Sequence, residues 1–439
     1  MSAASSCSFA VAVACAIGWS APARADAPRP IVGFEVRGPT RVTAETLAHL
    51  SHVDLGDRVA ESDLPEIELA LLSSELFETV AVELVPSGDG VIVAATLHDR
   101  LPWIAAPALY VLPKTFAIGA GYAESDLFGE DKKLLVFGQI GNRESFAFAT
   151  YMDPLLGGTH FIFRADVFPL RRMIDEYDNT NPRAPAIVRR STETYLDGGL
   201  LLGYELTWWL VPDVRIRGAR VKFRGAHAPD GTPLPEPERD GWDVSTQARI
   251  TADHRFHDRG ITWGAFAQAL VESSVPRLDS YGYQFARLRA YYSWRLFGDH
   301  ELELRSYLEA GRHLPFHEEV TLGSESDLRG YALEQLRGDA RATFRAEYSV
   351  PLGEVRKLAF RGLGFWDSGY ARYVMTDPSG MRDYLPFQRD GAHWWRNDVG
   401  AGFRIYVGSV VLPLVGVDVG YGLEGHSFEA YVELGLTDF

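Results

Sequence analysis

The chain has 439 residues, of which 46% are hydrophobic and 12% aromatic, and its formal net charge is −16 at pH 7. It is long enough for two or more domains, and its acidic balance argues against nucleic acid as a partner. No run of roughly 18 apolar residues follows the N-terminus, so no transmembrane helix is expected. The 42 glycines, 19 tyrosines and 10 tryptophans favour β-structure with aromatic girdles at a membrane interface.

Residues 1–25 are predicted to be a secretion signal. An apolar stretch, Phe9–Trp19, precedes the small-residue cleavage pattern Ala23–Ala25. No Lys or Arg precedes the apolar stretch, which favours a misplaced start; a lipoprotein signal through Cys15 is the alternative, with a poorer match around the cysteine. Both cysteines, Cys7 and Cys15, lie in this segment, so the predicted mature chain has no disulfide or thiol chemistry.

A small α+β domain is expected over residues 30–100. The predicted elements are, in order, a strand Ile31–Val36, a helix capped by Thr43 and running to Leu50, a helix opened by Ser62 with Pro65 in its first turn, and strands in Glu75–Val85 and Val91–Leu97. The order β-α-α-β-β, with the closing pattern S-x-L-F-x-x-V-x-V-x-L, resembles a POTRA domain, the periplasmic module of outer-membrane assembly proteins. One copy is present, and an unrelated α+β domain is the alternative.

From Trp103 onward apolar and polar residues alternate with period two. Within Tyr283–Phe297, for example, apolar residues share one face and arginines the other. A soluble sandwich rarely opposes so many charges to its apolar face, whereas a membrane barrel turns apolar residues to lipid and charges to a wet lumen. The barrel must close, because an open edge in lipid leaves backbone groups unsatisfied. We therefore predict an all-β transmembrane barrel over residues 101–439.

About sixteen antiparallel strands are predicted in this barrel. Their ranges are Trp103–Leu112, Thr115–Leu127, Lys133–Gly141, Ser145–Leu155, Thr159–Phe168, Thr192–Thr207, Trp208–Arg224, Trp242–Phe256, Ile261–Glu272, Gly282–Phe297, Glu301–Arg312, Arg341–Leu352, Lys357–Gly369, Asn397–Val407, Val410–Tyr421 and Ser427–Phe439. The first is the poorest β-former, because Pro107 and Pro113 disturb it; alternatively, residues 103–112 are a linker.

The connections predict the orientation of the barrel. Long ones follow the fifth, seventh, eleventh and thirteenth strands, and one of these contains Gly231–Gly241, which is expected to be disordered. Tight turns, such as Gly157-Gly158, Gly298-Asp299 and Gly408-Ser409, follow even strands. Outer-membrane barrels have short periplasmic turns and long outer loops, so both chain ends are expected in the periplasm.

The connection after the eleventh strand, Leu322–Asp339, carries the tripeptide Arg329, Gly330 and Tyr331. Together with the barrel and the single POTRA-like domain, this tripeptide resembles the BamA/TamA superfamily of outer-membrane assembly and translocation proteins, over nearly all of the mature chain. The resemblance implies that this tip folds back into the lumen. It also implies that Arg329 meets acids on the next two strands.

The two acids are predicted from matching segments. Arg341–Leu352 resembles the family's twelfth strand, which supplies Glu347, and Gly362–Gly369 resembles its F-x-D-x-G motif, which supplies Asp367. The alternation of both strands independently points these acids inward. Two inward acids on adjacent strands repel unless a cation lies between them, and a guanidinium offers several donors at once. A solvated arginine in a mobile loop is the alternative.

The remaining motifs give little sign of chemistry. Phe439 ends the chain as outer-membrane strands commonly end, and the resemblance makes it a terminal assembly signal. Two histidines, His254 and His257, could bind a metal at a turn, although solvated side chains are the commoner case. There is no G-x-S-x-G motif, no P-loop and no set of Cys or His ligands, so neither an enzyme nor a cofactor is expected.

Two function classes stay open at this stage. The first is a machine in the bacterial outer membrane whose periplasmic POTRA domain receives unfolded outer-membrane or secreted polypeptides by strand addition, with periplasmic chaperones or accessory lipoproteins as further candidate partners. Its barrel would deliver them through the lumen or through a parted seam between the first and last strands. The second is a passive pore or a structural surface-exposed barrel.

Overall fold

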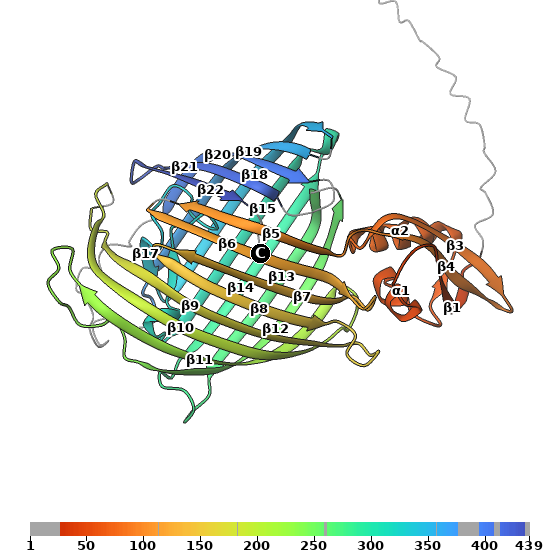
Figure 1. Ribbon diagram of the computed structural model, residues 1–439, viewed down its shortest axis with the longest axis horizontal. Helices are drawn as coiled ribbons and strands as arrows, with labels where there is room; N and C mark the ends of the chain where they lie inside the picture. Colours follow the sequence, from red (N-terminus) through yellow and green to blue (C-terminus); the bar gives the residue numbers. More distant parts are fainter. Residues whose placement is uncertain are drawn as a thin grey trace, which may run out of the picture.

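The computed structural model describes residues 27–112, 114–181, 183–258, 261–356, 358–375, 395–407 and 413–434. A small domain of helices and strands precedes a barrel of long strands (Figure 1). Within the described ranges, no helix has the length and apolar character that crossing a membrane requires. The predicted signal segment, the turn at Gly408-Ser409 and the terminal Phe439 lie outside these ranges.

The N-terminal domain has the expected elements in the expected order, with a two-residue strand and a short 3-10 helix added between the two helices. They are β1 (Arg29–Arg37), α1 (Ala44–Ser51), β2 (Arg58–Val59), η1 (Glu61–Asp63), α2 (Leu64–Ser73), β3 (Phe77–Ser87) and β4 (Gly90–Asp99). The sheet has the order β2-β1-β4-β3, with β1 parallel to β4. Its core includes Leu47, Leu71, Phe77 and Leu97, all fully buried, which gives this domain a hydrophobic core of its own.

The helix starts follow from local hydrogen bonds. Thr43 caps α1 as predicted, because its hydroxyl accepts from the Thr46 amide at 3.1 Å. The predicted opening of the second helix at Ser62 is wrong. The backbone amide of Ala60 donates to Asp63 Oδ2 at 2.9 Å, which closes the short η1 turn, and α2 begins after it at Leu64.

Within the described residues, the barrel contains sixteen antiparallel strands in one closed sheet, as predicted. They are β5 (Trp103–Leu112), β6 (Thr115–Leu127), β7 (Lys132–Gly141), β8 (Glu144–Asp153), β9 (Phe161–Asp178), β10 (Ala186–Tyr204), β11 (Leu210–His227), β12 (Gly241–Asp258), β13 (Ile261–Ser274), β14 (Gln284–Arg295), β15 (Glu301–Arg312), β18 (Ala340–Val355), β19 (Leu358–Arg372), β20 (Arg396–Val407), β21 (Pro413–Gly422) and β22 (Ser427–Leu434). Neighbours in the chain are neighbours in the barrel.

The two faces of the wall differ as the alternation predicted. Leu288 and Trp366 are 45% and 44% exposed on the outside, whereas Asp367, next to Trp366, is fully buried. Inside, ion pairs join adjacent strands, such as Arg249 on β12 to Asp213 on β11 at 2.8 Å. An apolar outside and a charged inside are typical of a membrane barrel.

Two predicted loops are structured instead. The connection after the fifth strand is short, because β9 continues to Asp178 and β10 starts at Ala186. Charged pairs sustain this extension: the Arg189 Nη2 atom lies 2.8 Å from Glu176 Oε2, and both side chains are buried. The predicted disorder of Gly231–Gly241 is also wrong, because Pro233 bridges to His227 and Asp240 accepts two hydrogen bonds from Arg224.

The seam between β22 and β5 is short in the described residues. It has three residue pairs, Leu434 with Leu109, Glu433 with Tyr110 and Val432 with Val111, whereas β5 makes ten pairs with β6 on its other side. The interpretation of residues 103–112 as a linker is therefore wrong, because β5 is a full strand paired with β6 along its whole length.

Candidate functional site

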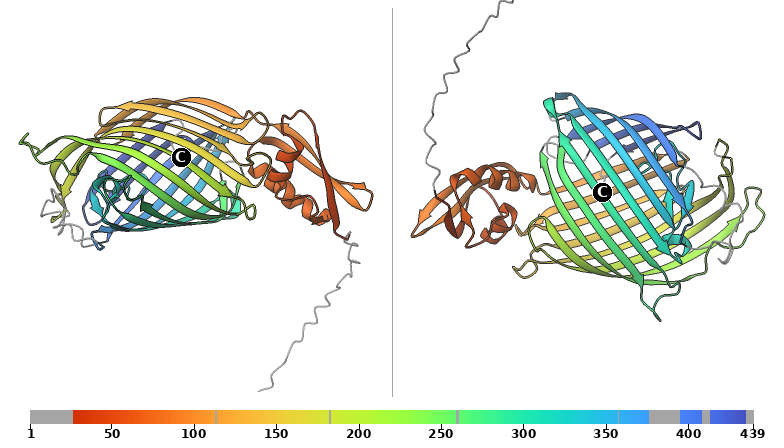
Figure 2. Two further views of the ribbon diagram at one scale, coloured as in Figure 1. Left: turned by 90° about the horizontal axis from the view of Figure 1, so that it is seen from below. Right: turned by 180° about the vertical axis from the view of Figure 1, so that it is seen from behind.

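The connection between β15 and β18 folds into the barrel as a hairpin (Figure 2). It contains η3 (Phe316–Glu318) and two short antiparallel strands, β16 (Val320–Leu322) and β17 (Leu336–Gly338). Residues 323–335 form its tip. Leu322, Leu328, Tyr331 and Leu336 pack there against Ala371 of the wall in one buried cluster. We call this segment, 313–339, the lumenal loop.

Arg329 is held by three acids, each from a different strand. Glu347 and Asp367 were predicted to hold it, and Asp418 was not. Its Nε and Nη2 atoms donate to the two Asp367 oxygens at 2.8 and 3.0 Å, and its Nη1 atom donates to Glu347 at 2.9 Å and to Asp418 at 3.2 Å. The guanidinium carbon also lies 3.3 Å from the centre of the Phe365 ring. The fork of a guanidinium fits such a set of carboxylates, because it can donate several bonds in one plane.

Burial and charge act in opposite directions on Arg329, which is fully buried. Burial on its own would lower the pKa of its guanidinium, but the hydrogen bonds and charge of Asp367, followed by Glu347 and Asp418, outweigh burial and raise that pKa. The arginine therefore stays charged. Its charge, together with that of the arginines beside Asp367 and Asp418, allows three carboxylates to lie together in the wall.

Gly330 and Tyr331 fix the tip to the last strands. The Gly330 amide donates to Asp398 on β20 at 2.9 Å. A Cβ atom at Gly330 would lie 2.4 Å from the backbone nitrogen of Gly422, so only glycine fits. The Tyr331 hydroxyl donates to Glu424 at 2.5 Å, and its carbonyl accepts from the Tyr431 hydroxyl at 3.2 Å.

Sequence reasoning missed Asp398 and Asp418. Each has a local signal: an inward acid on a strand whose lipid face is apolar, beside glycines that leave room for a loop. At Gly420 a Cβ atom would lie 2.4 Å from the Arg329 carbonyl oxygen. We define the clasp as Arg329, Gly330 and Tyr331 with Glu347, Asp367, Asp398 and Asp418.

A second attachment holds the start of the lumenal loop to another part of the wall. Arg217 on β11 donates from Nη2 to Asp243 on β12 at 2.6 Å and lies 2.9 Å from Glu318 on η3. The neighbouring His317 has its Nε2 atom 3.1 Å from Asp243. Asp243, His317 and Glu318 have the spacing of metal ligands, but the guanidinium already supplies the positive charge there.

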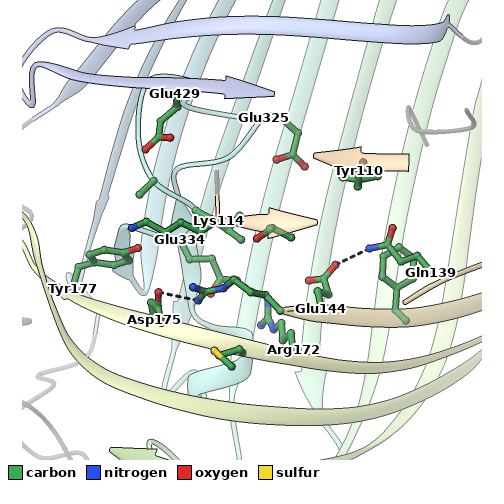
Figure 3. Close-up of a pocket in the computed structure, with 16 residues that line it drawn as sticks. Tyr110, Lys114, Gln139, Glu144, Arg172, Asp175, Tyr177, Glu325, Glu334 and Glu429 are labelled. Carbon is green, nitrogen blue, oxygen red and sulfur yellow. Dashed lines mark hydrogen bonds and ion pairs between the residues drawn. The ribbon is translucent and has the colours of Figure 1, made fainter. Parts of the chain in front are cut away.

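A third attachment joins the tip to β9 and to the connection that follows it. Arg172 donates to Glu334 at 2.5 Å, and the Asn179 side chain donates to the Gln335 carbonyl at 2.8 Å. Beside this contact lies a pocket of about 310 Å³, lined by charged residues of the wall and the loop (Figure 3). The lumenal loop therefore crosses the barrel and is attached to three parts of its wall.

The two histidines considered as a metal site lie on opposite faces of one strand. His254 and His257 lie on β12, three residues apart, so their side chains point to opposite faces. His254 packs on Trp208, with ring centres 4.7 Å apart, whereas His257 lies 2.9 Å from the Thr262 hydroxyl. They do not form one ligand set.

The structure has the three features on which the BamA/TamA resemblance rests. They are a closed barrel of sixteen antiparallel strands in the described residues, an inward Arg-Gly-Tyr loop after the eleventh strand and an N-terminal α+β domain.

Comparison with solved structures finds the same fold. The chain is similar to CdiB from Escherichia coli (TM-score 0.63, 13% identity, covering 92% of this chain and 76% of that one). It is also similar to BamA from Haemophilus ducreyi lacking POTRA domains 1–3 (0.56, 12%, 92% and 84%) and to CdiB from Acinetobacter baumannii (0.54, 14%, 93% and 74%). No protein-family model and no curated protein sequence matches the chain. At these identities the likeness establishes the fold.

Proposed function

We propose that this protein lies in the bacterial outer membrane and inserts, assembles or translocates other polypeptides. In this proposal the N-terminal domain is a periplasmic POTRA domain that receives an unfolded outer-membrane or secreted polypeptide, or a chaperone or accessory lipoprotein that carries one. The barrel then delivers the polypeptide. The shared fold with BamA and CdiB supports this class of function, and the site supports it further.

The observation that carries the proposal is the clasp. A passive pore needs an open lumen, but here a loop crosses the lumen and is fixed by a fully buried arginine with four hydrogen bonds to three acids. Burying these charges costs desolvation free energy, which is offset only when every buried charge has a partner. A loop fixed inside the lumen by so many contacts is expected in a machine whose barrel changes shape during its cycle, and a passive pore has no need of it.

The seam supports a lateral route for the polypeptide. The described part of this seam joins Leu109–Val111 to Val432–Leu434, and Pro107 within β5 cannot donate a ladder bond. A polypeptide strand could pair with this edge by the same hydrogen bonds that hold any sheet together.

Removal of the N-terminal domain tests the proposal. Deleting Pro30–Asp99 leaves the barrel strands intact, and the deleted domain has its own core. We expect a folded, heat-modifiable barrel in the membrane without activity, where activity is the level of outer-membrane and secreted proteins measured by proteomics after depletion of the wild-type protein. Full activity of the truncated protein would contradict the proposal that the domain receives the polypeptide. High conductance of the intact protein in planar bilayers would favour a passive pore.

A further inference from the structure

A cleft of about 850 Å³ lies between the N-terminal domain and the barrel. In Figure 1 both helices of the domain lie between its sheet and the barrel. The lining residues come from β1, from one face of α1 and the segment after it, and from the β8–β9 and β10–β11 connections. They include Val32, Phe34, Ala48, Leu55, Leu206 and Trp208. We call this space the interface cleft.

The interface cleft contains a free sheet edge. β1 pairs with β4 along one side up to Arg37, but β2 covers its other side only at Arg29 and Pro30. The segment after α1 adds two backbone hydrogen bonds, both to Ile31. Beyond Ile31, no described strand pairs with this side of β1, and Val32–Phe34 line the cleft. Unpaired strand edges are templates for another strand.

Attachment of the domain to the barrel preforms the cleft. The Gly129 carbonyl, in the β6–β7 turn, accepts from the Thr43 amide at 3.3 Å and from the Thr46 hydroxyl at 3.0 Å. Nearby, the His52 ring stacks on Trp208 with ring centres 4.3 Å apart. The two walls of the cleft are therefore held opposite each other before anything binds.

The chemistry of the lining defines the occupant. The lining combines apolar side chains with the acids Glu45, Asp54 and Glu205, and no Lys or Arg is among the described lining residues. Three histidines, at positions 49, 52 and 160, also line it, and the first of them lies 3.3 Å from Glu205, so Glu45 and Asp54 are the acids offered to a partner. Exposed apolar groups, such as Leu55 at 67% and Leu206 at 56%, favour apolar side chains of a partner. Acidic groups favour basic ones and oppose an anionic lipid headgroup.

We propose that the interface cleft binds an extended polypeptide segment in which apolar residues alternate with basic ones, by adding it as a strand to the free edge of β1. This inference rests on the proposed function, and it deepens it by naming the receiving edge and the kind of segment. The site is separate from the β22–β5 seam, because its barrel wall is formed by the β8–β9 and β10–β11 connections.

Crosslinking to the full chain in phospholipid nanodiscs tests the position. The probe is a synthetic peptide of alternating valine and lysine with one central cysteine, and Cys7 and Cys15 of the protein are replaced by serine. We expect disulfides to form with Val32→Cys and with Leu206→Cys, but not with Ala81→Cys on β3, the opposite edge of the sheet. Equal or stronger crosslinking at Ala81→Cys would overturn the proposal.

Binding measured by fluorescence anisotropy tests the chemistry. We expect the Glu45→Gln, Asp54→Asn double variant to bind the peptide at least fivefold more weakly, and a glutamate version of the peptide to bind wild type at least tenfold more weakly. Methylation of alternate peptide nitrogens should abolish binding, because the added strand would lose its hydrogen bonds. Charge-independent binding, or a phospholipid that competes with the peptide and is recovered by mass spectrometry, would overturn the proposal.

The two proposals fail in different ways. If the truncated barrel keeps full activity while the peptide still crosslinks at Val32→Cys, the proposed function is wrong and the binding site stands. If activity needs the domain but the peptide crosslinks only at Ala81→Cys, the binding site is wrong and the proposed function stands.

Discussion

Replacing Arg329 with alanine removes the cation that lies among Glu347, Asp367 and Asp418. Breaking a buried pair costs about 3–5 kcal/mol, because the remaining charge is left without its partner. Arg345 still lies 3.2 Å from Asp367, and another arginine still pairs with Asp418, so we expect the lower end, about 3 kcal/mol. That free energy corresponds to roughly a hundredfold larger population of the released lumenal loop.

Protease treatment of intact cells measures that population, because a released loop is exposed to the outside while a clasped one is protected. Arg329→Ala should be cut roughly a hundredfold faster within 323–335 and should lose activity. Arg329→Lys should recover only part of the protection, since an ammonium cannot fork between carboxylates. Arg224→Ala is the matched control: its side chain is 65% exposed, and an exposed pair contributes less than about 1 kcal/mol.

A double variant separates charge from packing. If uncompensated charge causes the loss, Arg329→Ala combined with Asp367→Asn should cost clearly less than the sum of the single changes. Unchanged protease resistance and unchanged activity in Arg329→Ala would refute the reasoning, because the clasp would then contribute nothing to holding the loop.

Three further outcomes are expected. Cysteines at Val111 and Val432, paired across the seam, should form a disulfide that stops activity until a reductant is added; full activity with the disulfide intact would leave the lumen as the route. Gly129→Val should detach the N-terminal domain, since a Cβ atom there would lie 2.0 Å from the Arg41 carbonyl oxygen, and hydrogen exchange in 43–52 should rise while the barrel stays protected. Burial raises the pKa of Glu75 from 4.5 to about 7, so its contribution to stability is present below pH 4.5 and lost as pH rises to 7. Glu75→Gln should flatten that loss, which amounts to about 3 kcal/mol in the hydrogen exchange of the domain; an unchanged profile would exclude Glu75 as the titrating group.

The inward direction of the clasp acids was predictable because their strands alternate cleanly. On β18, Phe344 and Tyr348 face outward, which places Glu347 on the inner face, and the same reasoning applies to Asp367 beside Trp366. A period of two carries this information locally. The resemblance then joined these acids to Arg329, a pairing that spacing in the sequence could not supply.

The missed features depend on contacts between distant segments. Asp418 is 89 positions from Arg329, and nothing near it in the sequence indicates which loop reaches it. The extension of β9 was missed because Pro169 and the charges after it are typical of a loop. In the structure the ladder continues past Pro169, since those charges find partners on β10 and the lumenal loop.

The attachments of the lumenal loop have a mechanical consequence for any opening of the seam. The tip is fastened to the wall that ends in β22, whereas η3 is fastened to β11 and β12 through Arg217 and Asp243. If β22 moves away from β5, the lumenal loop is stretched between these two parts of the wall. The length of the loop between its two attachments then limits how far the seam can open. The stretched loop also supplies a restoring force that brings β22 back to β5 after the polypeptide has left.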